Sequence, residues 1–128
     1  MYRMILCIGT AVLIAIAVQP ARADDASVCI YGTADEAIAA CSRLLVLDLH
    51  VAFVYNNRGN AYFRKGDYDH AILDYDQAIK LDPKDARFYN NRGTAYQRKG
   101  DYDHAIPDFD QASKLKPAED DARRGETK

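Results

Sequence analysis

The sequence has little excess charge of either sign. Of its 128 residues, 17 are Lys or Arg and 19 are Asp or Glu, so the formal net charge is −2. Without a basic excess, nucleic acid is an unfavourable ligand, because binding to phosphates calls for a positive patch. The same balance argues against binding to an anionic membrane surface.

Signatures of catalysis are also lacking: the chain has no Gly-rich phosphate loop, no metal-ligand cluster and no nucleophile elbow. His70 and His104 each follow a Tyr-Asp pair, but they occupy one repeated position a full repeat apart, and a solvated helix face explains them. The repeated acids, such as Asp67 and Asp101, fit helix starts better than a calcium loop. We therefore expect no enzyme activity, no cofactor and no bound metal.

The long apolar run at the N-terminus has the features of a secretory signal. Arg3 gives a positive start, Ile5 to Val18 form a 14-residue apolar segment, and stretch 21–23 has alanine at both positions that a signal peptidase reads. We expect residues 1–23 to be a cleaved signal peptide and the protein to be exported, to the periplasm or beyond. An uncleaved anchor is the alternative, although a membrane span needs about 20 apolar residues.

Cleavage after Ala23 would change the charge and the cysteine count. It would remove two arginines and no acid, leaving 15 basic residues against 19 acids, and 15 − 19 = −4. It would also remove Cys7 and leave Cys29 and Cys41. An even pair in an exported chain suggests a disulfide, with two buried free thiols as the alternative. A lone pair without a nearby histidine is a poor metal site.

An internal repeat dominates the remainder of the chain. Tyr55 to Asp85 aligns with Tyr89 to Glu119 at a constant offset of 34 residues, and 23 of the 31 aligned positions are identical. A fixed period of this size indicates stacked helical units, none of which buries its apolar face alone.

Each unit reads as two helices. The first is predicted over 52–65, where Gly66 ends it in a left-handed conformation. Asp67 is the expected N-cap of the second helix, and Pro83 stops it, because proline cannot continue the hydrogen-bond ladder. Gly59 is small where the two helices would cross closely.

These units resemble the tetratricopeptide repeat, whose pattern is W-x2-L-G-x2-Y, then A-x3-F, then P. The first copy reads Tyr55-x2-Arg58-Gly59-x2-Tyr62, Ala71-x3-Tyr75 and Pro83, and the second reads Tyr89-x2-Arg92-Gly93-x2-Tyr96, Ala105-x3-Phe109 and Pro117. Tyrosine replaces the tryptophan and arginine replaces the leucine, so the arginine position is expected to be half exposed. The resemblance implies an all-α fold, a short α-solenoid of helix-turn-helix repeats at 52–85 and 86–119, with a polar tail at 120–128.

A weaker copy of the repeat precedes these two, as a degenerate N-terminal half repeat at 24–51. Its second helix is predicted from Ala34 to Leu47, with a capping box formed by Thr33 and Glu36, and its first helix is expected to be missing. In the repeat register Cys41 faces the core and Cys29 lies where the missing helix would pack. The resemblance therefore implies a structural Cys29–Cys41 bond that pins this segment.

In this family the first helices of successive repeats line a concave groove that binds peptides. The matching positions here are Asn56, Asn57, Asn60, Phe63, Arg64, Asn90, Asn91, Thr94, Gln97 and Arg98. Asn57 and Asn91 correspond to the asparagine ladder of the O-linked GlcNAc transferase superhelix, which holds a peptide backbone. The alternative is an inert helix surface that is common in the family.

The resemblance thus implies a non-catalytic adaptor or scaffold that binds a protein or peptide. Two other readings stay open: a structural protein that self-assembles through an uncovered last helix, and a membrane-tethered module. Pro107 lies several residues into that last helix, where we expect a kink or a late helix start.

Overall fold

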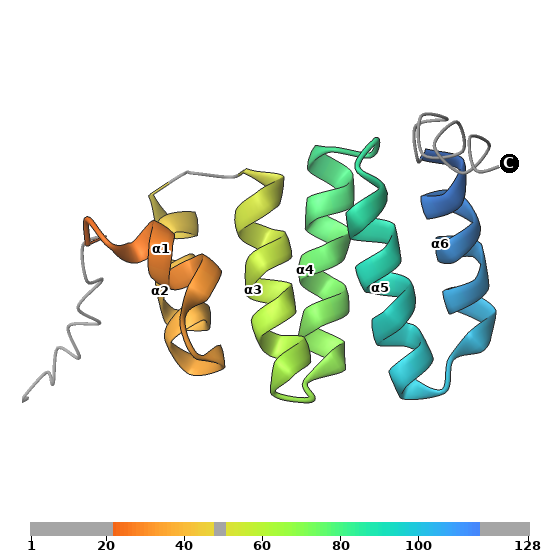
Figure 1. The fold of residues 1–128 in the computed structure, drawn as a ribbon, viewed down its shortest axis with the longest axis horizontal. Helices are drawn as coiled ribbons and strands as arrows, with labels where there is room; N and C mark the ends of the chain where they lie inside the picture. Colours follow the sequence, from red (N-terminus) through yellow and green to blue (C-terminus); the bar gives the residue numbers. More distant parts are fainter. Residues whose placement is uncertain (1–21, 48–50, 116–128) are drawn as a thin grey trace, which may run out of the picture.

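Six helices follow one another in the computed structural model, which describes residues 22–47 and 51–115. They are α1 (Asp25–Tyr31), α2 (Ala34–Val46), α3 (Ala52–Arg64), α4 (Tyr68–Leu81), α5 (Ala86–Lys99) and α6 (Tyr102–Leu115). Within these ranges the chain forms no strand, so the fold is all-α, as the repeat predicted. The helices stand side by side in a row, with α1 and α2 at one end and α6 at the other (Figure 1).

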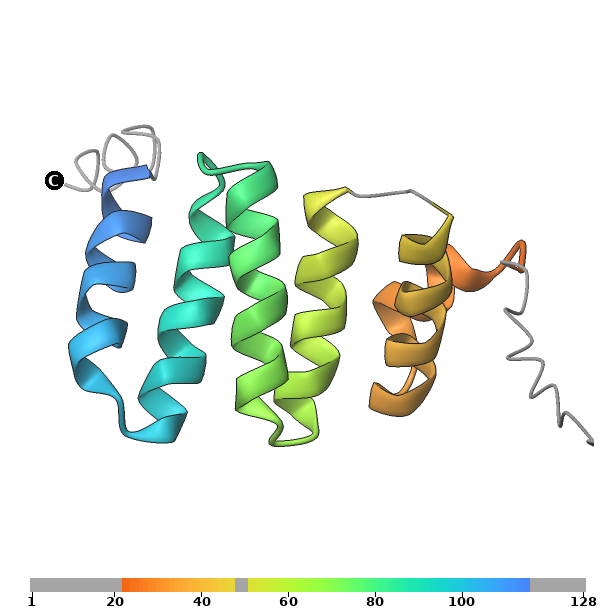
Figure 2. The same cartoon turned by 180° about the vertical axis from the view of Figure 1, so that it is seen from behind.

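The row is a short solenoid of helical hairpins. Each helix packs against the next one in the chain, and the first helices α1, α3 and α5 also contact one another in turn. Seen from behind, the same order holds, with α6 at the opposite end from α1 (Figure 2). Most of the predicted signal peptide (1–21) and the predicted polar tail lie outside the described residues.

The predicted turn between the two helices of a repeat is present in both full repeats. Gly66 and Gly100 follow the first helices with φ of 78° and 80°, in the left-handed region that glycine adopts without strain. The Asp67 side chain caps α4 by accepting a hydrogen bond from the backbone N–H of His70. The chain therefore turns twice in the same way, once in each repeat.

Close packing within a hairpin requires glycine on the first helix. A Cβ atom at Gly59 would lie 2.8 Å from Cε1 of Tyr75, and one at Gly93 would lie 3.0 Å from Cε1 of Phe109. The aromatic ring of the second helix thus rests directly on the backbone of the first. This contact confirms the predicted close crossing.

The N-terminal unit differs from the prediction in one respect. The capping box of Thr33 and Glu36 is present at the start of α2. The expected absence of a first helix is wrong, because α1 occupies that place with seven residues. Gly32 ends α1 two positions before α2, as Gly66 ends α3 two positions before α4. The unit is therefore a shortened hairpin.

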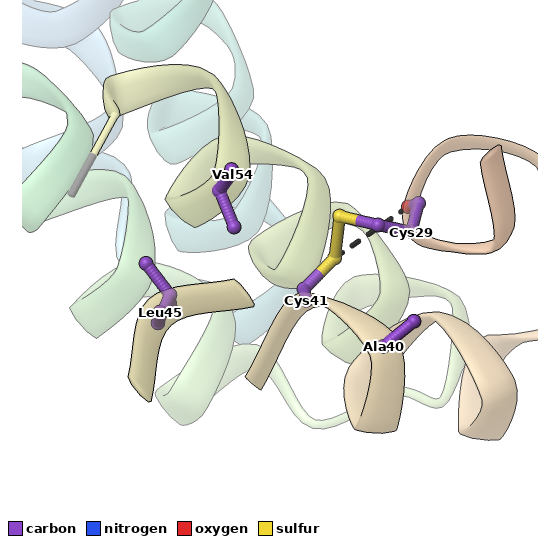
Figure 3. Packing of buried hydrophobic residues seen from close by; sticks show 5 residues of the cluster. All are labelled: Cys29, Ala40, Cys41, Leu45 and Val54. Carbon is purple, nitrogen blue, oxygen red and sulfur yellow. Dashed lines mark hydrogen bonds between the residues drawn. A yellow bond between two sulfur atoms is a disulfide. The ribbon is translucent and has the colours of Figure 1, made fainter. Parts of the chain in front are cut away.

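A disulfide joins the two helices of this shortened unit. The Sγ atoms of Cys29 on α1 and Cys41 on α2 are bonded, and both side chains are buried. Figure 3 shows the bond in a cluster with Ala40, Leu45 and Val54, the last of which comes from α3. The bond thus lies in the core between α1, α2 and the first full repeat.

A buried ion pair joins the two helices of each full repeat. Nε and Nη2 of Arg58 donate to the two carboxylate oxygens of Asp74, at 2.8 and 2.7 Å, and Arg92 makes the same bidentate contact with Asp108, at 2.8 and 2.6 Å. Both carboxylates are about 95% buried. The arginines were expected to be half exposed, but each side chain is 22% exposed and its charge is fully engaged.

The same arginines also reach the preceding unit. Nη1 of Arg58 donates to Oγ of Ser42 at 3.1 Å, and Nη1 of Arg92 donates to Asp76 at 2.6 Å. Ser42 and Asp76 are 34 residues apart, so they hold the same place in successive units. Each arginine therefore fixes both a hairpin and the stacking of two hairpins.

The N-terminal unit has an ion pair of its own. The Arg43 guanidinium on α2 donates to both oxygens of Asp25 on α1, at 2.9 and 2.5 Å. These hydrogen bonds lower the pKa of Asp25 to about 2. Because this pKa is below its ordinary value, the stabilisation is present above pH 3.8 and is lost as the pH falls towards 2.

The last helix does not start late. Tyr102 begins α6 at the position where Tyr68 begins α4, and Pro107 lies inside the helix. Pro107 is exposed, as is Leu73 at the same place in α4. The proline thus lies on the solvent side of the array.

We predict that loss of the disulfide destabilises the N-terminal unit. In the chain-entropy model, a bond that closes a loop of this length stabilises the protein by roughly 3 kcal/mol. Urea unfolding of the Cys29→Ala/Cys41→Ala variant, compared with the oxidised parent, should show a loss of this order. An unchanged midpoint after reduction of the parent would contradict the structural role of the bond.

We also predict that two of the basic residues of α5, Arg92 and Lys99, differ strongly in their contribution to stability. Arg92→Met leaves Asp108 buried without a partner and should lower the free energy of unfolding by about 3–5 kcal/mol. Lys99→Met removes an exposed pair with Asp69 and should change it by less than about 1 kcal/mol. Chemical denaturation measures both. Adding Asp108→Leu to Arg92→Met should restore part of the loss, and equal effects of the two single changes would refute the assignment.

Candidate binding surface on the first helices

The ten predicted groove residues all lie on the first helices of the two full repeats, and we call them the first-helix surface. On α3 they are Asn56, Asn57, Asn60, Phe63 and Arg64, and on α5 they are Asn90, Asn91, Thr94, Gln97 and Arg98. α3 and α5 contact each other directly. The structure therefore brings the two sets together, but it gives their members different roles.

Part of the set forms a hydrogen-bond network between the repeats. Nδ2 of Asn91 donates to Oδ1 of Asn56 at 2.8 Å and to Oδ1 of Asn60 at 3.3 Å. The Tyr75 hydroxyl donates to the same oxygen of Asn60 at 2.8 Å, and burial raises the pKa of this phenol. Asn56 is 7% exposed. These amides hold α5 against α3, which limits what they can offer a ligand.

Asn57 shows where this network stops. Its Nδ2 atom is buried and has no hydrogen-bond partner in the described part of the chain. Asn57 holds the place of Asn91 one repeat earlier, and the place of Asn60 is then taken by Ala26 on α1. A methyl group accepts no hydrogen bond. The shortened N-terminal unit thus lacks the acceptor that the second repeat finds.

Two other members of the set are used within their own repeat. The Phe63 ring is half-buried and packs against Tyr68, with the ring centroids 5.3 Å apart. The Thr94 hydroxyl donates to the Asn90 carbonyl oxygen at 2.8 Å. The Thr94 hydroxyl is therefore not a free donor, and one side of the Phe63 ring is covered within its own repeat.

The free hydrogen-bonding capacity of the surface is concentrated on α5. The side chains of Asn90, Gln97 and Arg98 are exposed and have no hydrogen-bond or ionic partner among residues 22–47 and 51–115. On α3, Arg64 is exposed and uses Nη2 for a 3.2 Å hydrogen bond to the Gly32 carbonyl oxygen. These four side chains can donate to a molecule that lies along the two helices.

The repeated histidines bind the aspartates that precede the second helices. Nδ1 of His70 lies 2.7 Å from Oδ2 of Asp67, and its ring stacks on Tyr62 with the centroids 5.1 Å apart. His104 repeats this arrangement in the second unit. The hydrogen bond from the His70 backbone lowers the pKa of Asp67. In the described ranges, no three His, Cys, Asp or Glu residues gather to hold a metal ion.

A hollow that the sequence did not indicate lies beside the short helix α1. Its volume is about 540 Å³, and it contains the Asp25–Arg43 pair. The residues that line it are Arg22, Asp24, Asp25, Ser27, Val28, Tyr31, Gly32, Glu36, Ala39 and Arg43. Its lining mixes both charges, with no concentration of either.

Across the ranges 22–47 and 51–115, none of the helices is long and apolar enough to cross a membrane.

The ion pairs between the helices were also missed by the sequence reading. A signal for them exists, because Arg58 and Asp74 are 16 residues apart and Arg92 and Asp108 repeat that spacing. An arginine in an apolar position of one helix and an acid on the inner face of the next together indicate a buried pair.

Comparison with known proteins gives a consistent result for the repeats. A family model described as "TPR repeat" matches residues 59–100, and one described as "Tetratricopeptide repeat" matches residues 86–118. The search of curated proteins found no similar sequence.

Solved structures match over most of the described helices, and 94 chains are similar. The crystal structure of MamA is 29% identical with a TM-score of 0.66, and the match covers 77% of this chain and 57% of MamA. The second TPR of Spaghetti (RPAP3), bound to the HSP90 peptide SRMEEVD, is 29% identical with a TM-score of 0.66, covering 72% of this chain and 85% of that one. The match to "MamA MSR-1 C2" spans about half of that protein, 52%.

The helix order, the glycine contacts and the family matches all describe one repeat type. Its relatives support a role as a protein-interaction scaffold. Residues 59–118 of this chain therefore belong to the tetratricopeptide-repeat family.

Proposed function

We propose that this protein is a non-catalytic adaptor that binds an extended segment of another protein along the first-helix surface. The observation that carries the proposal is a set of exposed side chains on α5 that have no partner in the described part of the chain, Asn90, Gln97 and Arg98. Together with Arg64 on α3, they lie on two helices that are in contact. An extended chain that crosses both helices would meet them in succession.

The chemistry of these side chains suits a peptide backbone. A side-chain amide offers both a donor and an acceptor, which match the N–H and C=O groups of an extended chain. Arg64 and Arg98 can add charge-assisted hydrogen bonds to an acidic side chain or a terminal carboxylate. The network centred on Asn91 holds the underlying helices in place, so little order has to be gained on binding.

A related structure supports a ligand of this class. The second TPR of Spaghetti (RPAP3) was solved with the peptide SRMEEVD, which contains three acidic residues. For the present chain we propose a segment with one or two acidic residues, because its exposed cations on this surface are the arginines at 64 and 98. Two full repeats form a short surface, so the affinity should be micromolar or weaker.

The test is a selection of peptides against the exported chain. A displayed library of random 12-residue peptides is panned on the wild-type protein, and the most enriched peptide is measured by fluorescence anisotropy. We expect enrichment of acidic residues and a dissociation constant that rises by about tenfold or more in the Asn90→Ala/Arg98→Glu variant, because the lost contacts amount to at least ~1.4 kcal/mol.

The matched control is Asp103→Ala, an exposed substitution on α6, away from the first helices. It should leave the affinity for the selected peptide unchanged. Peptides without acidic residues, or equal binding to the wild type and the double variant, would contradict the proposal. Both variants alter exposed side chains, so circular dichroism should show unchanged helix content.

We further propose that the protein works after export, in the periplasm or outside the cell. The Cys29–Cys41 disulfide supports this, because such bonds persist in oxidising compartments. Cleavage after Ala23 would leave the Asp25–Arg43 pair intact, since both residues follow the cleavage site.

N-terminal sequencing of the protein from the cell envelope checks this proposal. We expect the mature chain to begin at Asp24, because the alanines at 21 and 23 satisfy the peptidase. Replacing Ala21 with a bulky residue should block processing. An intact N-terminus in the wild-type protein would instead indicate the membrane-tethered alternative.

A further inference from the structure

The last helix of the array has an outer face that the rest of the described chain leaves uncovered. Within the described ranges α6 packs against α5 and against no other helix. Figures 1 and 2 both show it at the end of the row. α4 and α6 are equivalent helices of the two repeats, and α5 covers the corresponding face of α4. The contacts between α4 and α5 therefore indicate which kind of helix can pack on α6.

The apolar centre of the covered face lies on α4. Ala71, Ile72 and Tyr75 form one buried cluster with Ala95 of α5, and Tyr96 of α5 packs against it. Ile72 is only 7% exposed as a result. The neighbouring helix therefore supplies a small residue and an aromatic residue next to each other.

Two acidic residues flank this centre and fix the register of the neighbour. Asp69 pairs with Lys99, and Asp76 pairs with Arg92 at 2.6 Å. The two bases are seven residues apart on α5, which is two helical turns, so both point to the same side. If Arg92 is position i, the helix that covers such a face carries bases at i and i+7, a small residue at i+3 (Ala95) and an aromatic residue at i+4 (Tyr96).

The outer face of α6 has the equivalent apolar and acidic residues, but no described helix packs on it. Ile106 stands in the place of Ile72 and is 59% exposed. Asp103 and Asp110 stand in the places of Asp69 and Asp76, and neither has a basic partner among the described residues. Within residues 22–47 and 51–115, an apolar centre between two carboxylates without basic partners therefore faces outwards.

We propose that this outer face of α6, made by Asp103, Ile106 and Asp110, binds an amphipathic helix of another protein. The partner helix carries Arg or Lys at i and i+7, a small residue at i+3 and an aromatic residue at i+4. Its bases pair with Asp110 and Asp103, and the residues between them cover Ile106. This site is separate from the first-helix surface and takes a different ligand, a basic helix.

A second copy of this chain does not fit the site. Stacking in the repeat register would place α1 of the next copy over α6. Asp24, the residue before α1, holds the same repeat position as Arg92 of α5, and Tyr31 holds that of Lys99, so neither of the two required bases is present. Asp24 would lie near the free carboxylates and repel them. Pairing two α6 faces would likewise bring acid against acid.

The following segment of the chain also lacks the required pattern. If the 34-residue repeat continued beyond α6, Glu126 would hold the position of Arg92. Ala122 would hold the position of Phe88, which is buried. The acid would lie near Asp108 and Asp110. Charge complementarity therefore selects a basic helix from elsewhere.

The experiment uses the α5 sequence as the probe. A fluorescent peptide of residues 86–99, held helical by a side-chain lactam on its outer face, is titrated into the full chain. We expect saturable binding that weakens with salt. Protein with Asp103→Lys/Asp110→Lys should bind about tenfold more weakly, because two exposed pairs are lost and reversed. A peptide with Glu in place of both bases should bind the charge-reversed protein better than the wild type.

The control variant is Asp24→Lys, which makes the same kind of charge change on an exposed acid at the other end of the array. It should leave binding unchanged. Equal binding of the probe to wild-type and charge-reversed protein would overturn the proposal. So would binding that occurs only after residues 116–128 are removed, which would assign the face to the chain's own segment. A dimer of the free protein that Ile106→Asp dissociates would assign it to a second copy.

Discussion

The arrangement of the whole array depends on a bidentate ion pair that is made twice. Arg58 holds Asp74, and Arg92 holds Asp108, and both carboxylates are buried. A buried carboxylate that loses its partner is strongly destabilising, and the planar guanidinium accepts only a narrow range of orientations. The pair therefore fixes the angle within a hairpin. The third guanidinium nitrogen of each arginine, Nη1, donates to the preceding unit, so the same side chain also sets the stacking of the hairpins.

Much of the fold could be predicted because the repeat makes local signals consistent. Gly66 and Asp67 end one helix and begin the next, and the second copy repeats them. Helix α1 could not be predicted in this way. Isolated helices of seven residues are unstable in water, so α1 depends on the Cys29–Cys41 bond and on Arg43. Helix propensity depends on the local sequence alone, so it does not reveal a helix that tertiary contacts stabilise.

The helices on which the ten side chains lie were predicted, but the contacts of those side chains were not. The spacing on α3 and α5 placed all ten side chains on the first helices. It did not reveal that Asn91 would bind Asn56 and Asn60, because that contact joins residues 35 and 31 positions apart on different helices. Nor could it show that Nδ2 of Asn57 has no acceptor among the described residues. Interactions between repeats depend on stacking geometry, which the pattern within one helix does not contain.

A repeat protein also offers an internal comparison that a single-copy fold lacks. α4 and α6 share most of their sequence, so the difference between Ile72 and Ile106 comes from the neighbour and not from the residue itself. Fully burying an isoleucine is worth about 1.5–3 kcal/mol, and roughly half of that remains available at Ile106.

The largest change between the two helices does not disturb this face. Pro107 replaces Leu73, and both positions are exposed. Leu73 stays 59% exposed even though α5 covers its helix, so this position lies away from the docked neighbour. The proline therefore alters the solvent side of α6 and leaves Asp103, Ile106 and Asp110 in the register of their α4 counterparts. The end of the array keeps the geometry of a joint between repeats, and the pattern of its acids specifies the helix that can complete it.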